Sequence, residues 1–136
     1  TYAEAANEYY GTSDDDIVDD AMIYTCVNQV RNRAGLHPVA DKTKKEMRET
    51  IHRERTVELA FENVRYFDLR RWREAEIVLN RPVHGVQITK DESTGEFIYS
   101  APIEVEDRVF PERCYYYPIP QSELNKNAAL TPNPGW

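Results

Sequence analysis

Apolar residues at the start of the chain recur at intervals of three and four and predict two helices in a row. The first is expected over residues 2–10, with Gly11 as its left-handed stop. The second is expected to run from Ser13, which forms a capping-box pattern with Asp16, to about Ala34. Together they would form a helical hairpin. A single hairpin cannot bury its own apolar face, so it needs neighbouring elements.

The capping-box residues Thr43 and Glu46 predict a third helix, which is expected to continue to about Glu62. One face of this helix mixes apolar and charged residues at intervals of four and three. The members of this face are Met47, Ile51, Glu54, Glu58, Phe61 and Arg65. Buried charges persist only when they are paired and hydrogen-bonded, so this face predicts ion pairs.

The predicted ion-pair network joins carboxylates to arginines that lie three residues away on a helix surface. Its members are Glu54, Arg55, Glu58, Glu62, Arg65, Asp68 and Arg71. Glutamates one helical turn apart also satisfy the carboxyl spacing that glycoside hydrolases use. A structural network is favoured because these residues share a face with apolar side chains, and charges in such surroundings demand partners. We therefore expect no catalytic residues.

The second half of the chain changes pattern several times. Asn63 tolerates a left-handed backbone and is expected to bend the chain before a helix over about 64–79. Alternating residues then predict a β-hairpin, with strands over 86–89 and 97–99 and a turn-rich segment between them. Residues 100–113 are expected to be irregular or extended, and the prolines at 118 and 120 exclude a regular helix there. One helical turn is expected over 122–127, before an extended end.

Composition excludes several functions. The net charge of −7 argues against nucleic-acid binding, which uses basic patches to neutralise phosphates. No apolar run reaches the ~18–20 residues of a membrane span. His37, His52 and His84 lack metal-ligand spacing, and the aspartates near the amino terminus suit the start of a helix, so no metal or cofactor is expected. Cys26 and Cys114 can form one disulfide or remain two free thiols.

Five segments resemble motifs of the SusD/RagB family and follow one another in the family's order. They are residues 2–8 (the family's YAEALNE), 28–36 (NxVRxRAGL), 53–72 (ERxxELAFEGxRYFDLRRW), 118–123 (PIPQSE) and 133–136 (NPGY). Each segment alone is a weak indication of the family, but together the five segments span almost the whole chain. The resemblance is therefore specific.

Two positions depart from the family's pattern. Asn63 stands where the family has Gly, and Asn is the next best residue for a positive-φ bend. Trp136 replaces a terminal Tyr and keeps an aromatic anchor. The resemblance implies a mainly α fold: a tetratricopeptide-like helix pair, further helices, a small β-hairpin and a loop-rich carboxy-terminal part. It also implies that residues 1–136 form a single domain, the carboxy-terminal segment of a longer protein.

The same resemblance implies a role in nutrient uptake. Family members bind oligosaccharides or other nutrients at the outer surface of the outer membrane of Bacteroidetes-type bacteria. They are held there by a lipid anchor, expected upstream of this chain, and they work with a SusC-like TonB-dependent transporter. The amino-terminal part of the same protein is a further expected partner. The chain is thus expected to be part of a binding protein, not an enzyme.

Aromatic side chains are candidates for glycan contacts because their rings can stack on the apolar face of a pyranose. The candidates are Tyr99, Tyr115, Tyr116 and Tyr117, although packing is the commoner fate of aromatic residues. Tyr99 is favoured because binding residues gather on loops and hairpins. The alternative function is a helical-repeat scaffold that binds other proteins and has no glycan site of its own.

Overall fold

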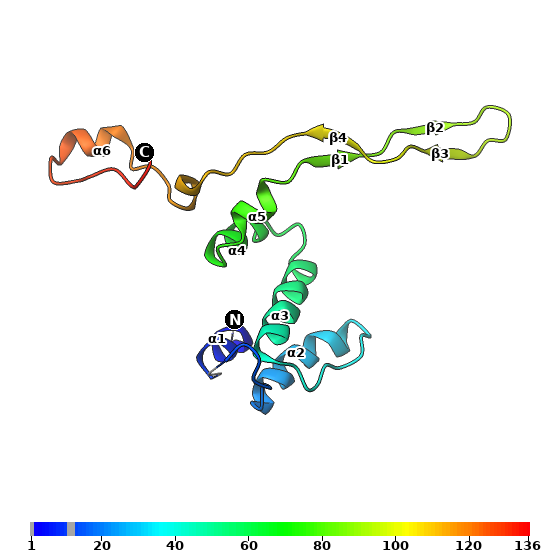
Figure 1. Cartoon of the computed structure of the whole chain (residues 1–136), viewed down its shortest axis with the longest axis horizontal. Helices are drawn as coiled ribbons and strands as arrows, with labels where there is room; N and C mark the ends of the chain where they lie inside the picture. The colour runs from blue at the N-terminus through cyan, green and yellow to red at the C-terminus, as the bar shows by residue number, and fades with distance from the viewer. Residues whose placement is uncertain (1, 11–12) are drawn as a thin grey trace. The chain divides into compact units, whose positions relative to one another are not determined.

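A computed structural model of the chain describes residues 2–10 and 13–136. The described residues are mainly helical, with a small antiparallel strand pairing, which confirms the predicted fold class (Figure 1). The chain divides into two compact units. We name residues 1–65 the first unit and residues 66–136 the second unit. The stop predicted at Gly11 lies outside the described residues.

The first unit contains three helices: α1 (Tyr2–Tyr9), α2 (Ala21–Arg33) and α3 (Lys44–Glu58). Helix α1 packs against both α2 and α3. Spacings of three or four residues place the apolar positions of each helix on one face, and these faces meet in a core. The core residues are Ala3, Ala6, Ile23, Val27, Met47 and Ile51. The small alanines allow α1 to approach its neighbours closely.

The second helix begins at Ala21, so the predicted start at Ser13 is wrong. The expected local chemistry is present, because the Ser13 backbone N–H donates to the Asp16 carboxylate at 2.9 Å. It forms an isolated turn, however, and the chain then pairs with the segment before α3 through a bridge between Ile17 and Thr43. Pairing with a distant segment therefore overrides the local helix signal.

The start of α3 follows the prediction. The Thr43 hydroxyl accepts from the Glu46 backbone N–H at 3.2 Å, and the Glu46 carboxylate accepts from the Thr43 N–H at 3.1 Å. The helix ends at Glu58, earlier than expected. Phe61 and Asn63 have positive φ, 67° and 61°, so the bend at Asn63 is confirmed. Because the helix has ended, Phe61 is fully exposed and does not continue the buried face of α3.

Two short helices replace the single helix predicted over 64–79: α4 (Arg65–Arg71), which begins at the last residue of the first unit, and α5 (Ala75–Leu79), which lies in the second unit. Arg73 lies between them with a φ of 59°, which interrupts the helix. The core of this unit contains Leu69, Ala75, Phe110 and Tyr115.

Four short strands follow the two helices and form two successive antiparallel pairs along one extended ribbon (Figure 1). The strands are β1 (Val83–Gly85), β2 (Ile88–Lys90), β3 (Phe97–Tyr99) and β4 (Ile103–Glu106). The predicted hairpin is confirmed as β2 paired with β3. The pairing of β1 with β4 was not predicted, and it makes part of the supposedly irregular segment regular.

The remainder contains a short 3-10 turn, η1 (Glu112–Tyr115), and α6 (Gln121–Lys126), which confirms the predicted helical turn. The end of the chain folds back onto η1. The Trp136 indole N–H lies within hydrogen-bond distance of the carbonyls of Arg113, at 3.2 Å, and Tyr116, at 3.1 Å. Gly135 has a φ of 85°, and a Cβ there would lie 2.8 Å from Arg113 Cβ.

Candidate functional site

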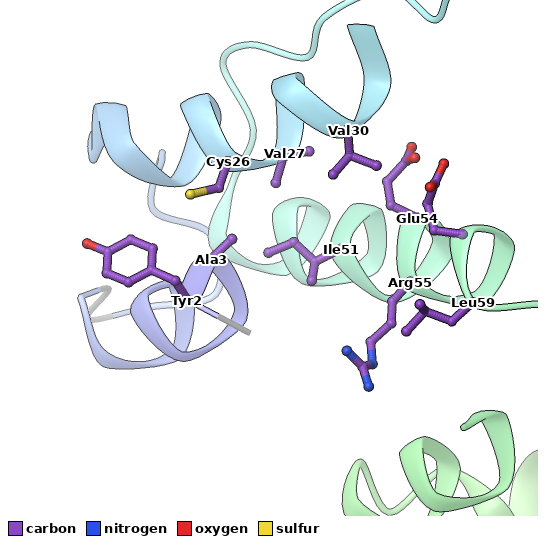
Figure 2. A pocket seen from close by; sticks show the side chains of 10 residues that line it. Tyr2, Ala3, Cys26, Val27, Val30, Ile51, Glu54, Arg55 and Leu59 are labelled. Carbon is purple, nitrogen blue, oxygen red and sulfur yellow. The ribbon is translucent and has the colours of Figure 1, made fainter. Parts of the chain in front are cut away.

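The first unit contains an open groove of about 400 Å³ between α1, α2 and α3 (Figure 2). We name it the helix groove. Its apolar lining is formed by Ala3, Val27, Val30, Ile51 and Leu59. Three of these residues belong to the buried core, whereas Val30 and Leu59 are only half-buried. The helix groove is therefore an apolar surface that the three helices leave uncovered.

The two ends of the helix groove differ in chemistry (Figure 2). Tyr2 and Cys26 lie toward one end, where the Tyr2 side chain is 55% exposed. Glu54, Arg55 and Glu58 lie toward the other end. Among the described lining residues, ionic side chains are thus confined to one end of an otherwise apolar groove.

Both groove glutamates form ion pairs with arginines of α2. Glu54 pairs with Arg31, and their side chains are only 14% and 19% exposed. Glu58 pairs with Arg33, which is largely in solvent. The sequence predicted partners along a single helix, whereas these two pairs join α2 to α3. Because a half-buried charge needs its partner, the Arg31–Glu54 pair fixes how these helices pack.

The other residues of the predicted network lie elsewhere. Arg55 lines the helix groove and points away from α2 (Figure 2). Arg65 donates to the Thr56 hydroxyl at 2.8 Å. Arg71 pairs at 2.8 Å with Asp68, whose side chain is buried. Glu62 is exposed. Asp68 and Arg71 belong to the second unit, so the predicted residues are divided between the two units.

Replacing Glu54 with glutamine is expected to lower the free energy of unfolding by about 1–3 kcal/mol, because the half-buried Arg31 loses its charged acceptor while the shape is kept. Chemical denaturation followed by circular dichroism measures this change. Glu49→Gln is the matched control, since Glu49 is exposed on the same helix. Equal stability of the two variants would show that the Arg31–Glu54 pair does not stabilise the packing.

A second charged cluster lies where α1 meets α3. The Arg48 guanidinium donates to both carboxylate oxygens of Glu8, at 2.6 and 2.7 Å, and to the Asp14 carboxylate at 2.9 Å. These hydrogen bonds, and secondarily the positive charge, hold the pKa values of Glu8 and Asp14 below their ordinary range. Arg48 thereby links three segments of the first unit.

The Arg48 cluster predicts a pH dependence of stability. A carboxyl whose pKa is lowered by folding adds stability above its unfolded pKa, about 4, and this stability is lost as the pH falls through the folded value. We expect Arg48→Gln to reduce the unfolding free energy by up to about 1 kcal/mol at pH 7, a small effect because the partners are exposed. The difference from the wild type should shrink as the pH falls below about 4 and passes through the lowered folded pKa values of Glu8 and Asp14. Arg53→Gln, at an exposed position of the same helix, should show no such dependence.

In the second unit, arginines lie over the faces of several tyrosines. The Arg70 guanidinium is 4.3 Å from the Tyr117 ring centroid and 5.4 Å from that of Tyr66. Arg73 lies 4.4 Å from the Tyr115 centroid and donates to the Tyr116 hydroxyl at 2.8 Å. Cation–π contacts of this kind stabilise packing.

The four candidate tyrosines therefore differ in exposure. Tyr115 is 9% exposed, and its ring also makes an edge contact with Phe110. Tyr116 and Tyr117 are 44% and 60% exposed, and an arginine covers one face of each ring. Tyr99 is 65% exposed on strand β3.

Tyr99 has an aromatic neighbour on the same face of the ribbon. Successive side chains of a strand point to opposite faces, so Phe97 and Tyr99 point the same way. Ile88 and Lys90 lie opposite them on β2 and share that face. Both aromatic rings are more than half exposed. The hairpin thus presents two adjacent rings to solvent.

The profile of one protein family matches the chain over residues 1–136, and this family is the SusD family. The chain belongs to it. A SusD-like protein from Bacteroides fragilis NCTC 9343, whose crystal structure is known, is 30% identical to this chain, with a TM-score of 0.77. The match covers 98% of this chain and 23% of the chain of that protein. No curated protein matches the sequence.

Two further SusD-family structures show the same fold. A SusD superfamily protein from Parabacteroides distasonis ATCC 8503 is 29% identical with a TM-score of 0.60, over 99% of this chain and 25% of its own. A protein from Bacteroides fragilis NCTC 9343, described as a SusD-like carbohydrate binding protein, is 30% identical with a TM-score of 0.68, over 93% of this chain and 26% of its own. The chain spans about a quarter of the length of these relatives.

The helix groove of this SusD-family chain, and the role of Arg31 and Arg33, were not predicted from the sequence. The available signals were two arginines at the end of α2 and two glutamates one turn apart on α3. The pairing becomes visible only once α2 and α3 are known to lie side by side. Local spacing alone therefore suggested partners within one helix.

Three further properties of this SusD-family chain concern metal ligands, cysteines and membrane-spanning helices. Among the described residues there is no cluster of three or more His, Cys, Asp or Glu side chains that could hold a metal. Cys26 and Cys114 are free thiols in the structure. Within the described ranges, no helix is long and apolar enough to cross a membrane.

Proposed function

We propose that this chain is the carboxy-terminal segment of a cell-surface protein that binds oligosaccharides or related nutrients. In this proposal the whole protein is lipid-anchored at the outer surface of the outer membrane and hands its ligand to a SusC-like TonB-dependent transporter. The observation that carries the proposal is the family match over all of residues 1–136. A relative with 30% identity is described as carbohydrate binding, which supports the ligand class.

Binding without hydrolysis is part of the proposal. A glycosidase needs two carboxyl groups that flank the substrate. The two groove glutamates, Glu54 and Glu58, are both engaged by arginines of α2. Apart from Arg55, the groove lining beside them is mostly apolar and offers few groups to orient sugar hydroxyls. These features favour a structural role for both glutamates.

Within this chain, the hairpin is the proposed glycan contact. Tyr99 and Phe97 form an exposed aromatic pair, and the neighbouring Lys90 can donate hydrogen bonds to sugar hydroxyls. Tyr115 is enclosed by Phe110 and Arg73, whereas Tyr116 and Tyr117 keep one face for solvent. We therefore rank Tyr99 first among the four tyrosines. Much of the ligand surface is expected in the part of the protein outside this chain.

The test is retention of the full-length protein on gels that contain bacterial, plant or host polysaccharides. We expect retention without release of sugar, and a loss of about five-fold in affinity for Tyr99→Ala, equivalent to roughly 1 kcal/mol of stacking. Tyr9→Ala, at an exposed tyrosine of the first unit, is the matched control. Sugar release, or failure to retain any polysaccharide, would refute the proposal.

A further inference from the structure

A second pocket of the first unit, which we name the polar pocket, has a volume of about 240 Å³. It lies where the end of α1, the segment before α2 and the start of α3 meet. Its polar lining is formed by Asn7, Tyr10, Asp16, Asp19, Asp20 and Lys44. We propose that the polar pocket binds a single neutral sugar unit and is a second contact for oligosaccharides besides the hairpin. This inference deepens the proposed function and rests on it for the ligand class.

The buried side chain of Asn7 supplies an unused hydrogen-bond acceptor to the polar pocket. Its amide nitrogen donates to the Lys44 carbonyl at 3.1 Å and to the Glu8 carboxylate at 3.3 Å, which fixes the orientation of the amide. Asn7 is only 2% exposed, and its carbonyl oxygen has no hydrogen-bond partner among the described residues. A buried acceptor without a partner costs free energy. A hydroxyl group of a bound sugar can supply the missing donor.

Two carboxylates of the polar pocket also have oxygens that can accept hydrogen bonds. Asp19 is exposed and has neither a hydrogen bond nor an ion pair within the described part of the chain. Asp20 caps α2 with one oxygen, which accepts from the Met22 N–H at 2.8 Å. Tyr10 is 59% exposed and adds an aromatic ring. Acceptors for hydroxyl groups and a ring that can stack on a sugar therefore lie around one pocket.

Hydrogen bonds between distant segments hold the walls of the polar pocket in place. The Lys44 N–H donates to the Asp16 carbonyl, and the Val18 N–H donates to the Lys42 carbonyl, both at 2.9 Å. Ile17, between Asp16 and Val18, forms the strand bridge described above. A pocket whose walls are fixed before the ligand arrives loses little conformational freedom on binding.

The volume of the polar pocket suits one sugar unit. A cavity of ~150 Å³ holds benzene, and a hexose has about twice as many heavy atoms. The polar pocket, at about 240 Å³, is larger than such a cavity and is bordered by exposed residues. The remaining units of an oligosaccharide would extend into solvent. We therefore expect the polar pocket to take the end or a single branch of a chain.

The charges around the polar pocket disfavour an ion as its ligand. Its carboxylates would repel the carboxylate or sulfate group of an acidic sugar. No three of the described His, Cys, Asp or Glu side chains are placed to hold a metal ion together, and Lys44 adds a positive charge to the lining. A neutral molecule that carries several hydroxyl groups is the class that fits.

Binding of methyl glycosides of glucose, galactose, mannose and xylose to the full-length protein tests the proposal. Ligand-observed NMR is used in the Tyr99→Ala background, in which the hairpin contact is weakened. We expect Asp19→Ala to weaken binding of the best glycoside about five-fold or more, because a hydroxyl acceptor is lost. Asp15→Ala removes the same charge from an exposed position outside the lining and should leave the affinity unchanged. Equal affinities of the two variants would overturn the proposal.

A second pair of variants uses neighbouring tyrosines. Tyr9 and Tyr10 are both exposed, and their rings make an edge contact at a centroid distance of 4.9 Å, but only Tyr10 lines the polar pocket. Tyr10→Ala should weaken glycoside binding, whereas Tyr9→Ala should not. The reverse order would place the sugar outside the polar pocket and refute the assignment.

Monodeoxy methyl glycosides test the contact with Asn7 without altering the protein. Removal of one particular hydroxyl group should weaken binding about ten-fold, because the analogue leaves the buried acceptor unpaired. If every monodeoxy analogue binds as well as the parent glycoside, no hydroxyl group donates to Asn7 and the proposal fails.

The remaining outcomes separate this proposal from the proposed function. Retention of polysaccharides without binding of any neutral glycoside would refute a sugar site in the polar pocket and leave the proposed function standing. Glycoside binding that depends on Asp19, without retention of any polysaccharide, would have the opposite meaning. Calcium chloride is titrated in a parallel calorimetric experiment. Binding of calcium that is lost in Asp19→Ala, in the absence of glycoside binding, would make the polar pocket a cation site and overturn the proposal.

Discussion

Replacing Met47 with alanine is expected to lower the free energy of unfolding by about 2–5 kcal/mol, the range for truncating a fully buried aliphatic side chain. Met47 has 0% exposure and lies in the core between α1, α2 and α3. Alanine removes its contacts and leaves a cavity, because the surrounding helices can relax only partly. The melting temperature should fall by about 10 °C or more.

Met22→Ala is the matched control for Met47→Ala. Met22 is the chain's second methionine, lies on α2, and is 53% exposed. Its truncation should change the unfolding free energy by less than about 0.5 kcal/mol. Thermal and denaturant unfolding followed by far-ultraviolet circular dichroism measures both variants. A similar effect of both substitutions would contradict the assigned core of the first unit.

Replacing Phe110 with alanine is expected to cost about 3–5 kcal/mol in the second unit. Phe110 is 6% exposed, and its ring makes edge contacts with Tyr66 and Tyr115 at centroid distances of 6.4 and 5.1 Å. The substitution removes this ring but keeps the backbone hydrogen bonds to the side chain of Asn80. The loss of unfolding free energy therefore reports on the packing of the aromatic ring and not on the backbone hydrogen bonds at this position.

Phe97→Ala is the control for Phe110→Ala, because it removes the same side chain from an exposed strand of the same unit. Phe97 is 61% exposed, so its truncation should cost less than about 1 kcal/mol, mostly through lower strand propensity. Denaturant unfolding compares the two variants. A larger loss from Phe97 would show that the hairpin, and not the Phe110 cluster, stabilises the second unit.

Sequence patterns predicted the features whose interactions are short in range. The capping box of α3 joins residues three apart, Thr43 and Glu46, and it forms as expected. The bend at Asn63 needs only the tolerance of asparagine for positive φ. The β2–β3 hairpin is closed by the Asp91 carboxylate, which accepts from the Ser93 and Thr94 backbone N–H groups. Each of these depends on neighbours in the sequence.

Features that depend on distant segments were missed. The turn at Ser13 has the chemistry of a helix start, yet the bridge between Ile17 and Thr43 draws the following residues into a different pairing. The pairing of β1 with β4 likewise joins segments separated by the whole hairpin. Periodicity along one element carries no information on such partners.

The candidate sites show the same difference between features set by sequence neighbours and features set by distant segments. The sequence identified Glu54 and Glu58 as charges on an apolar face, but their arginine partners come from another helix. It identified the tyrosines after position 114 as aromatic candidates, but the arginines that cover Tyr115 and Tyr117 come from α4 and the residues just after it. Residue type and local face were predictable, and partners across elements were not.

The division of the chain at residue 65 also separates its spectroscopic probes. Trp72 and Trp136, the only two tryptophans, both lie in the second unit, whereas Met22 and Met47, the only two methionines, both lie in the first. Indole fluorescence and methionine-methyl NMR signals therefore report on different units without labels or mutations. Coincident transitions would define one cooperative folding unit, and separate transitions would give each unit a stability of its own.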